Sequence, residues 1–262
     1  MNKGTIQGRE AFIANLSSRL GRRAVQQTAP AHPYCGAPDF YKALRPTTEE
    51  KIELFIESWQ ALTGKVLVVE EAEAKEKIAA WLVETAKELG VTHVSRWEHE
   101  GLKTLGLDAA LIEAGIGVVP WAEAEAGEPI PGETVRTVPP LPEGSVWTKR
   151  SELLQRTERC QLGVVWPDYA VANTSTLVLQ CAPDRGRSVS LLTQILFAVF
   201  RADQLVYRMG EALTEITKGK ASPEQYASSL NLITGPSRSA DIENDLTIGI
   251  HGPGKVYAVI IK

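Results

Sequence analysis

The stretch that decides the fold is residues 65–95, KVLVVEEAEAKEKIAAWLVETAKELGVTHVS. It opens on a short run rich in β-branched residues, a composition typical of a strand buried on both faces of a parallel sheet. Apolar residues then recur at helical spacing from Ile78 to Leu89, and Gly90 marks the end of the predicted helix. A second strand is expected over 91–95. The order strand, helix, strand predicts a βαβ unit.

The same alternation continues on both sides of this unit. Thr47 and Glu50 have the spacing of a capping box, and the helix that they begin is predicted to end at Gly64. A short helix over 107–113 and an apolar run over 116–121 extend the pattern. Further strands are predicted over 162–166, 177–181, 195–200, 204–207, 231–234 and 256–261. The sequence therefore predicts an α/β fold with an open, mostly parallel sheet and flanking helices.

The first 46 residues are predicted to form a separate arm. Phe12, Leu16 and Leu20 fall on one face of a predicted helix, and a proline-rich connector without periodicity follows. We therefore expect residues 1–46 to form a helix with its connector, and residues 47–262 to form the α/β domain. The apolar face of the helix has two possible partners, which are its own domain and another subunit.

Composition and charge limit the classes of partner. The chain has 262 residues, of which 44% are hydrophobic and 23% charged, as in an average soluble globular protein. Its formal charge of −4 provides no basic field, which argues against nucleic acid and anionic lipid as partners. The N-terminus is polar and no apolar run is long enough for a membrane span, so we expect a cytoplasmic protein.

The cysteines and histidines do not form a metal-binding pattern. Cys35, Cys160 and Cys181 are far apart in sequence and include no C-x-x-C pair. His93 and His99 flank a tryptophan, but a metal site there needs two further ligands to which the sequence does not point. We therefore expect no metal and no cofactor in this chain.

Residues 168–176, DYAVANTST, are the first candidate site. The hydroxyls of Thr174, Ser175 and Thr176 are short-reach donors that suit an anion or sugar hydroxyls. Asp168 is a candidate catalytic carboxylate. A turn followed by an edge strand explains the same segment equally well.

Residues 184–188, DRGRS, are the second candidate. Arg185 and Arg187 flank a glycine, and two guanidinium groups can clamp a carboxylate or a phosphate. A solvated turn is the alternative interpretation of this segment.

Residues 235–243, GPSRSADIE, form a third candidate directly after a predicted strand. Ser237 is a candidate helix cap, and exposed backbone N–H groups with Arg238 favour an anion site. Asp241 would lie in the first turn and neutralise the same dipole, so an internally satisfied helix start is also open. His251, in a glycine-rich loop, is the best acid–base candidate, although a histidine that bonds a loop carbonyl is as plausible.

These segments closely resemble the LUD-domain family, and the resemblance covers essentially the whole chain. The most specific part is 235–243 followed by LTIGIHGP at 246–253. The opening KGTIQ and the early RLG resemble the lactate-utilization members of the family. Matches in the middle of the chain are 168–170, 176–179, 186–187 and 189–192.

One departure from the family pattern affects a candidate site. Where the family typically reads Ala-Glu-(Thr/Ser)-Gly-Thr, residues 172–176 read ANTST. Asn173 therefore replaces a carboxylate, and an amide cannot act as a base. Ser175 replaces a glycine and restricts the backbone there.

The resemblance implies a fold similar to that of glucosamine-phosphate isomerases, ribose-phosphate isomerases and CoA-transferases. It also implies a role in bacterial oxidation of L-lactate to pyruvate, together with partner proteins that carry iron–sulfur clusters. This chain has no cluster-binding cysteine pattern, so the electron-carrying role falls to the partners.

Three functional hypotheses follow. In the first, the chain is an accessory or substrate-handling subunit of that system, its arginines at 185, 187 and 238 hold a carboxylate or a phosphate, and His251 with Asp241 orients or shuttles a proton. In the second, it is a stand-alone enzyme on a sugar-phosphate or CoA-ester substrate, with Asp168 or Asp241 as base or nucleophile. In the third, it is an interaction module that binds a partner protein through its N-terminal helix and proline-rich connector, and its α/β domain binds no small ligand.

Overall fold

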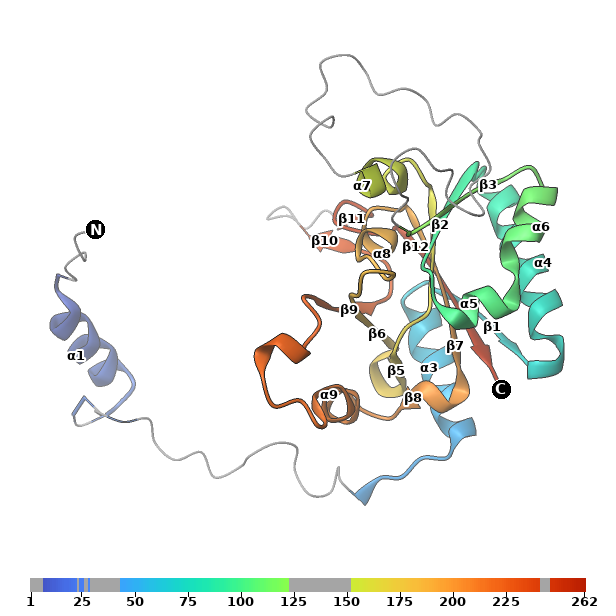
Figure 1. Cartoon of the computed structure of the whole chain (residues 1–262). Coiled ribbons are helices and arrows are strands. Elements are labelled where there is room, and N and C mark those ends of the chain that lie inside the picture. Colours follow the sequence, from blue (N-terminus) through green and yellow to red (C-terminus); the bar gives the residue numbers. More distant parts are fainter. Residues whose placement is uncertain (1–6, 23, 26–27, 29–42, 123–151, 241–245) are drawn as a thin grey trace, which may run out of the picture. The chain divides into compact units, whose positions relative to one another are not determined.

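The computed structural model describes residues 7–22, 24–25, 28, 43–122, 152–240 and 246–262 (Figure 1). The chain divides into two compact units, Met1–Arg45 and Pro46–Lys262. The first unit contains helix α1 (Arg9–Arg19), which follows a left-handed Gly8. The candidate residue Asp241 lies outside the described residues.

A six-stranded sheet forms the centre of the second unit (Figure 1). Its strand order is β1-β12-β7-β4-β2-β3, and every neighbouring pair is parallel. The strands are β1 (Lys65–Val69), β2 (His93–Arg96), β3 (Gly117–Pro120), β4 (Leu162–Val165), β7 (Ile195–Arg201) and β12 (Lys255–Ile261). The middle strands are apolar and almost wholly buried, as expected for a parallel sheet covered on both faces. The predicted open, mostly parallel α/β sheet is confirmed.

Helices cover both faces of this sheet (Figure 1). Alternate residues of a strand face opposite sides, so Phe197 and Phe200 of β7 point in opposite directions. Phe197 packs on Trp81 of α4, and Phe200 packs on Phe55 of α3, with ring centroids 5.2 and 5.4 Å apart. The helices in the described part of this unit are α3 (Thr48–Ala61), α4 (Ala74–Glu88), α5 (Glu100–Leu105), α6 (Leu107–Glu113), α7 (Glu152–Thr157), α8 (Ser188–Leu191) and α9 (Met209–Thr217).

The predicted capping box at the start of α3 is present. The Thr47 N–H donates to Glu50 Oε2 over 2.7 Å, and the Glu50 N–H donates to Thr47 Oγ1 over 3.2 Å. Two of the unpaired donors at the helix start are thereby satisfied locally.

A second, four-stranded sheet has the order β8-β5-β6-β9. Its strands are β5 (Tyr169–Val171), β6 (Thr176–Gln180), β8 (Leu205–Val206) and β9 (Leu230–Thr234). Helix α9 packs on it through a small apolar cluster that includes Val171, Val178 and Ile216. Short 3-10 turns connect the elements, namely η1 (Glu71–Glu73), η3 (Ala172–Thr174), η4 (Ala202–Gln204) and η5 (Pro223–Gln225).

The helix start predicted at Ser237 is wrong. The chain there forms an antiparallel pair of strands, β10 (Arg238–Ala240) and β11 (Leu246–Ile248). Local sequence suits a helix cap, but strand pairing with residues further along the chain decides the conformation. The N–H of Gly249 donates to the carbonyl of Ser237 and extends the pairing by one step. Within the described parts of the chain, no helix is long and apolar enough to cross a membrane.

Candidate functional site

The direction of the chain through the sheet reverses between the neighbouring strands β2 and β4. From β2 the chain runs outward to β3, whereas from β4 it runs toward β7 on the opposite side. In open α/β sheets a ligand crevice forms at such a point, outside the carboxyl ends of the strands. His99 and Asp168 each lie three residues beyond the end of one of these strands. The topology therefore favours a ligand site at this edge of the sheet.

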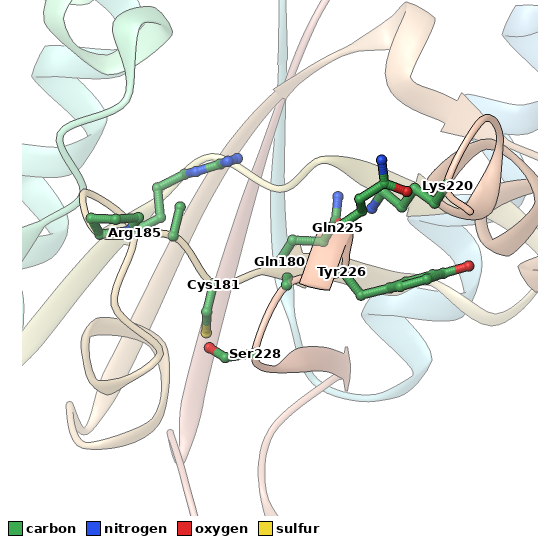
Figure 2. A pocket seen from close by; sticks show the side chains of 10 residues that line it. Gln180, Cys181, Arg185, Lys220, Gln225, Tyr226 and Ser228 are labelled. Carbon is green, nitrogen blue, oxygen red and sulfur yellow. The ribbon is translucent and has the colours of Figure 1, made fainter. Parts of the chain in front are cut away.

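Two adjoining clefts lie beside these residues. The larger has a volume of about 700 Å³ and is lined by residues that include Arg185, Lys220 and Tyr226 (Figure 2). The smaller has a volume of about 350 Å³, and its lining includes His99 and Asp168. Gln180 and Lys220 line both clefts. Both volumes suit a small molecule.

Asp168 anchors one side of the clefts. The Arg185 guanidinium donates through Nη1 to Asp168 Oδ1 over 3.0 Å, and the Gln180 N–H donates to Oδ2 over 2.8 Å. The amide of Gln204 donates to the carbonyls of Pro167 and Asp168, which fixes the backbone at this point. Both carboxylate oxygens of Asp168 already accept hydrogen bonds, so this residue positions Arg185. The Arg185 side chain extends toward the Lys220 side of the cleft (Figure 2).

The loop that carries Arg185 is held by two tryptophans. The buried Trp97 Nε1–H donates to the carbonyl of Gly186 over 2.8 Å, and the Trp121 Nε1–H donates to the carbonyl of Pro183 over 3.1 Å. A Cβ on Gly186 would lie 2.0 Å from the Trp121 ring. The loop therefore approaches the ends of β2 and β3 closely, and a glycine is needed for that approach.

His99 has a fixed ring orientation. Its imidazole stacks on Trp166, with ring centroids 5.2 Å apart and planes 12° apart. Its Nδ1 accepts a hydrogen bond of 3.1 Å from the Gly101 N–H at the start of α5. A backbone N–H can only donate, so Nδ1 carries no proton and the hydrogen of the neutral ring lies on Nε2.

Burial and the positive charge of Arg185 lower the pKa of His99, and they outweigh the opposing carboxylates of Asp168, Asp184 and Glu100. The charged imidazolium is disfavoured because it would lose solvation and face a guanidinium. At neutral pH His99 is therefore a neutral hydrogen-bond donor through Nε2.

An ion-pair network holds the segment between β2 and His99. Arg96 donates through Nε and Nη2 to both carboxylate oxygens of Asp108, over 2.8 and 2.7 Å, and through Nη1 to Glu98. Burial alone would raise the pKa of Glu98. The charges of Arg96 and Lys103, and their hydrogen bonds, outweigh this effect and hold the pKa below its ordinary value. Burial likewise opposes the charge on Arg96, yet Asp108 and Glu98 together raise its pKa above the ordinary value.

These shifts predict that acid destabilises the fold in two steps. The folded pKa of His99 lies below its unfolded value near 6.5, so the unfolded chain binds more protons, and stability falls, as the pH drops below that value. Glu98 also has a depressed pKa, and its stabilisation is lost only as the pH falls below about 4.5. Urea unfolding from about pH 8 to about pH 3 measures both steps. The variant His99→Asn is expected to lose the first step only, and an unchanged first step would contradict this assignment.

The predicted hydroxyl cluster is present, but it lies at the start of β6, whereas the two clefts adjoin Gln180 at the end of that strand. The Thr176 Oγ1 lies 2.8 Å from Thr174 Oγ1 and 2.7 Å from Thr234 Oγ1, so these hydroxyls bond one another. Ser175 is wholly buried in the left-handed conformation with φ of 45°, and its Oγ has no partner among the described residues. Asn173 is exposed. The segment is a 3-10 turn leading into a strand.

Ser175 tests the effect of the missing glycine. We expect Ser175→Gly to be more stable than Ser175→Ala by about 1 kcal/mol, because both remove the hydroxyl but only glycine adopts a positive φ without strain. Denaturant unfolding of the two variants measures the difference. Equal stability of the two would mean that the backbone at this position is not strained.

A third group of candidates lies at the amino end of the sheet. The Ser237 N–H donates to the carbonyl of Pro253, and the His251 N–H donates to Ser237 Oγ over 3.3 Å, just before β12 begins. Arg238 Nη2 donates to the carbonyl of Leu62 over 2.9 Å. Asp168 lies beyond the opposite end of the sheet, and a strand of seven residues spans about 23 Å. One small ligand therefore cannot contact both Asp168 and His251.

The remaining candidates do not join either group. Arg187 is exposed and directly precedes α8. Across the described ranges, no cluster of three or more His, Cys, Asp or Glu side chains could hold a metal ion.

Sequence reasoning considered His99 only as a metal ligand and did not single out Lys220. The available signal for His99 was its place just after a predicted strand, whereas Lys220 has no local signal.

Comparisons with known proteins agree with the family resemblance. A lactate utilization protein C from Halalkalibacterium halodurans is 26% identical, with 98% of this chain and 99% of that protein covered. The protein of the same name from Bacillus subtilis is 28% identical, with 100% and 99% covered. A crystal structure of a DUF162 family protein from Deinococcus radiodurans is 20% identical, covers 83% of this chain and 100% of its own, and has a TM-score of 0.48. The LUD domain family matches residues 52–261, and the chain therefore belongs to this family.

Proposed function

We propose that this chain is a component of a cytoplasmic system that oxidises L-lactate to pyruvate, and that it is the subunit that handles the substrate. Relatives that align over nearly their full length are named lactate utilization protein C, which supports the process. The three cysteines are too far apart in sequence to form a local cluster motif, so we assign electron transfer to iron–sulfur partner proteins.

The observation that carries the proposal is an ammonium group between the two clefts. Lys220 lines both, and its Nζ lies 3.4 Å from the amide oxygen of Gln180 and 5.0 Å from the centroid of the Tyr226 ring. Among the described residues, no carboxylate lies within ion-pair distance of Lys220. Arg185, in contrast, is already paired with Asp168. Lys218, which also lines the smaller cleft, pairs with Glu215, so among the described residues that line the two clefts Lys220 is the cation available to bind a carboxylate.

The alternative, a stand-alone enzyme on a sugar phosphate or CoA ester, needs a carboxylate free to act as base or nucleophile. Asp168 is the candidate in the cleft, and both of its oxygens already accept hydrogen bonds. These contacts favour binding and orientation over covalent chemistry by this residue.

Thermal unfolding with added ligands tests the proposal. L-lactate or pyruvate is expected to raise the melting temperature of the wild-type chain, because a ligand at about 100 times its Kd stabilises the native state by about 2.7 kcal/mol. Lys220→Met should lose the shift. Arg238→Met, which removes a cation at the opposite end of the sheet, should keep it.

Three outcomes would contradict the proposal. A shift kept in Lys220→Met and lost in Arg238→Met would place binding at the amino end of the sheet. A shift with ribose 5-phosphate or coenzyme A, and none with lactate or pyruvate, would favour the stand-alone enzyme. No shift with any of the four compounds would mean that this chain does not hold the substrate by itself.

A further inference from the structure

We infer that the Nε2–H of His99 donates a hydrogen bond to the oxygen on C2 of a 2-hydroxy or 2-oxo carboxylate bound in the smaller cleft. The inference rests on the proposed function, since it places such a carboxylate beside Lys220. It adds the residue that distinguishes a 2-hydroxy or 2-oxo acid from a plain carboxylic acid.

The ring is held so that only one nitrogen can serve a ligand. Nδ1 is occupied by the Gly101 N–H, and the imidazole face lies against Trp166. A Cβ on Gly101 would lie 2.7 Å from the Trp166 ring, so the start of α5, the indole and the imidazole are closely packed. Turning the ring over would break the bond from Gly101. His99 belongs to the lining of the smaller cleft, and Nε2 is the ring nitrogen that the bond from Gly101 leaves to serve a ligand there.

The charged groups around this nitrogen indicate which donor binds which part of the ligand, Lys220 or His99. Arg185, Asp168, Asp184 and Glu100 are the charged groups that act on His99, and their net effect with burial keeps the ring neutral. The remaining charged groups of the smaller cleft are Glu215, Lys218 and Lys220, of which Lys218 pairs with Glu215. Lys220 therefore suits the carboxylate charge, whereas a neutral N–H suits an uncharged hydroxyl or keto oxygen.

The variant His99→Asn separates donation to a ligand from a structural role of His99, because asparagine can replace only the structural contact. Its side-chain oxygen can accept the Gly101 N–H and cap α5 as Nδ1 does, and asparagine is among the best capping residues. It does not reach the position of Nε2. Glutamine reaches further and places an N–H group near that position. His99→Asn is thus expected to fold like the wild type and to lack the donor, and His99→Gln to restore part of it.

Calorimetric titration at neutral pH with L-lactate, pyruvate and propionate tests the inference, because propionate lacks the oxygen on C2. The wild type is expected to bind L-lactate and pyruvate about tenfold more tightly than propionate, as one net hydrogen bond allows. In His99→Asn the three affinities should be equal and close to that of propionate, and His99→Gln should recover part of the preference.

The outcomes separate this inference from the proposed function. A preference retained in His99→Asn, or equal binding of all three acids by the wild type, overturns the role of His99 and leaves the carboxylate cleft standing. No binding of any acid overturns both. Independently of ligands, the ¹⁵N shifts of the His99 ring should report hydrogen on Nε2, and hydrogen on Nδ1 overturns the inference.

Discussion

Replacing Gly163 with alanine is expected to lower the free energy of unfolding by about 3 kcal/mol or more. Gly163 lies within β4, paired with both β2 and β7. A Cβ there would lie 1.9 Å from the carbonyl oxygen of Val189 and 2.8 Å from Thr193 Oγ1. The nearer atom belongs to the backbone of α8, which cannot move aside without separating the helix from the sheet.

Gly210→Ala is the matched control. Gly210 lies in the first turn of α9, and a Cβ there would have nothing within 4 Å. Alanine is favoured over glycine inside a helix by about 1 kcal/mol, so this variant should be as stable as the wild type or more so. Denaturant unfolding measures both. A Gly163→Ala protein within about 1 kcal/mol of the wild type would mean that α8 does not pack on β4 as closely as described.

Asp168→Ala is expected to cost about 2 kcal/mol of stability, because it leaves the Arg185 guanidinium and the Gln180 N–H without their acceptor. The Asp168 and Arg185 side chains are only 15% and 25% exposed, so water replaces the lost contacts poorly. The same change releases Arg185 from its place in the cleft.

A double-mutant cycle isolates the contribution of this pair. Asp168→Ala combined with Arg185→Met should be less destabilising than the sum of the two single changes, by about 1 kcal/mol. The control is Glu71→Ala, which breaks an ion pair with Arg201 whose side chains are 59% and 45% exposed, and should change stability by less than about 0.5 kcal/mol. An Asp168→Ala effect no larger than that of Glu71→Ala would remove Asp168 as the anchor of the cleft.

The sheet was predictable because its signals are local. The run at 65–69, the helix that follows it and the Thr47–Glu50 capping box each depend on residues within a few positions of one another. The β10–β11 pair was not predictable in the same way, since residues 237–241 have helix-start chemistry and their partner strand begins only at Leu246. Strand pairing across a gap in sequence outweighed the local preference.

The site was less predictable than the fold because it is assembled from distant segments. Asp168 and Arg185 were identified from sequence, but their pairing changes what they do, since each satisfies the other. His251 stood out in a glycine-rich loop, yet the structure places it at the amino end of the sheet. The tautomer of His99 depends on the nearby Gly101 N–H, but its stacking and its lowered pKa depend on Trp166 and Arg185, which lie far along the chain.

We propose that a small carboxylate binds at the carboxyl ends of β2 and β4. Amide ¹H–¹⁵N spectra of the full chain, recorded during titration with L-lactate and with pyruvate, test it most directly. The largest changes in amide chemical shift are expected at His99, Asp168, Gln180 and Lys220 and their neighbours. Changes concentrated on Ser237, Arg238 and His251 would contradict it and move the site to the opposite end of the sheet.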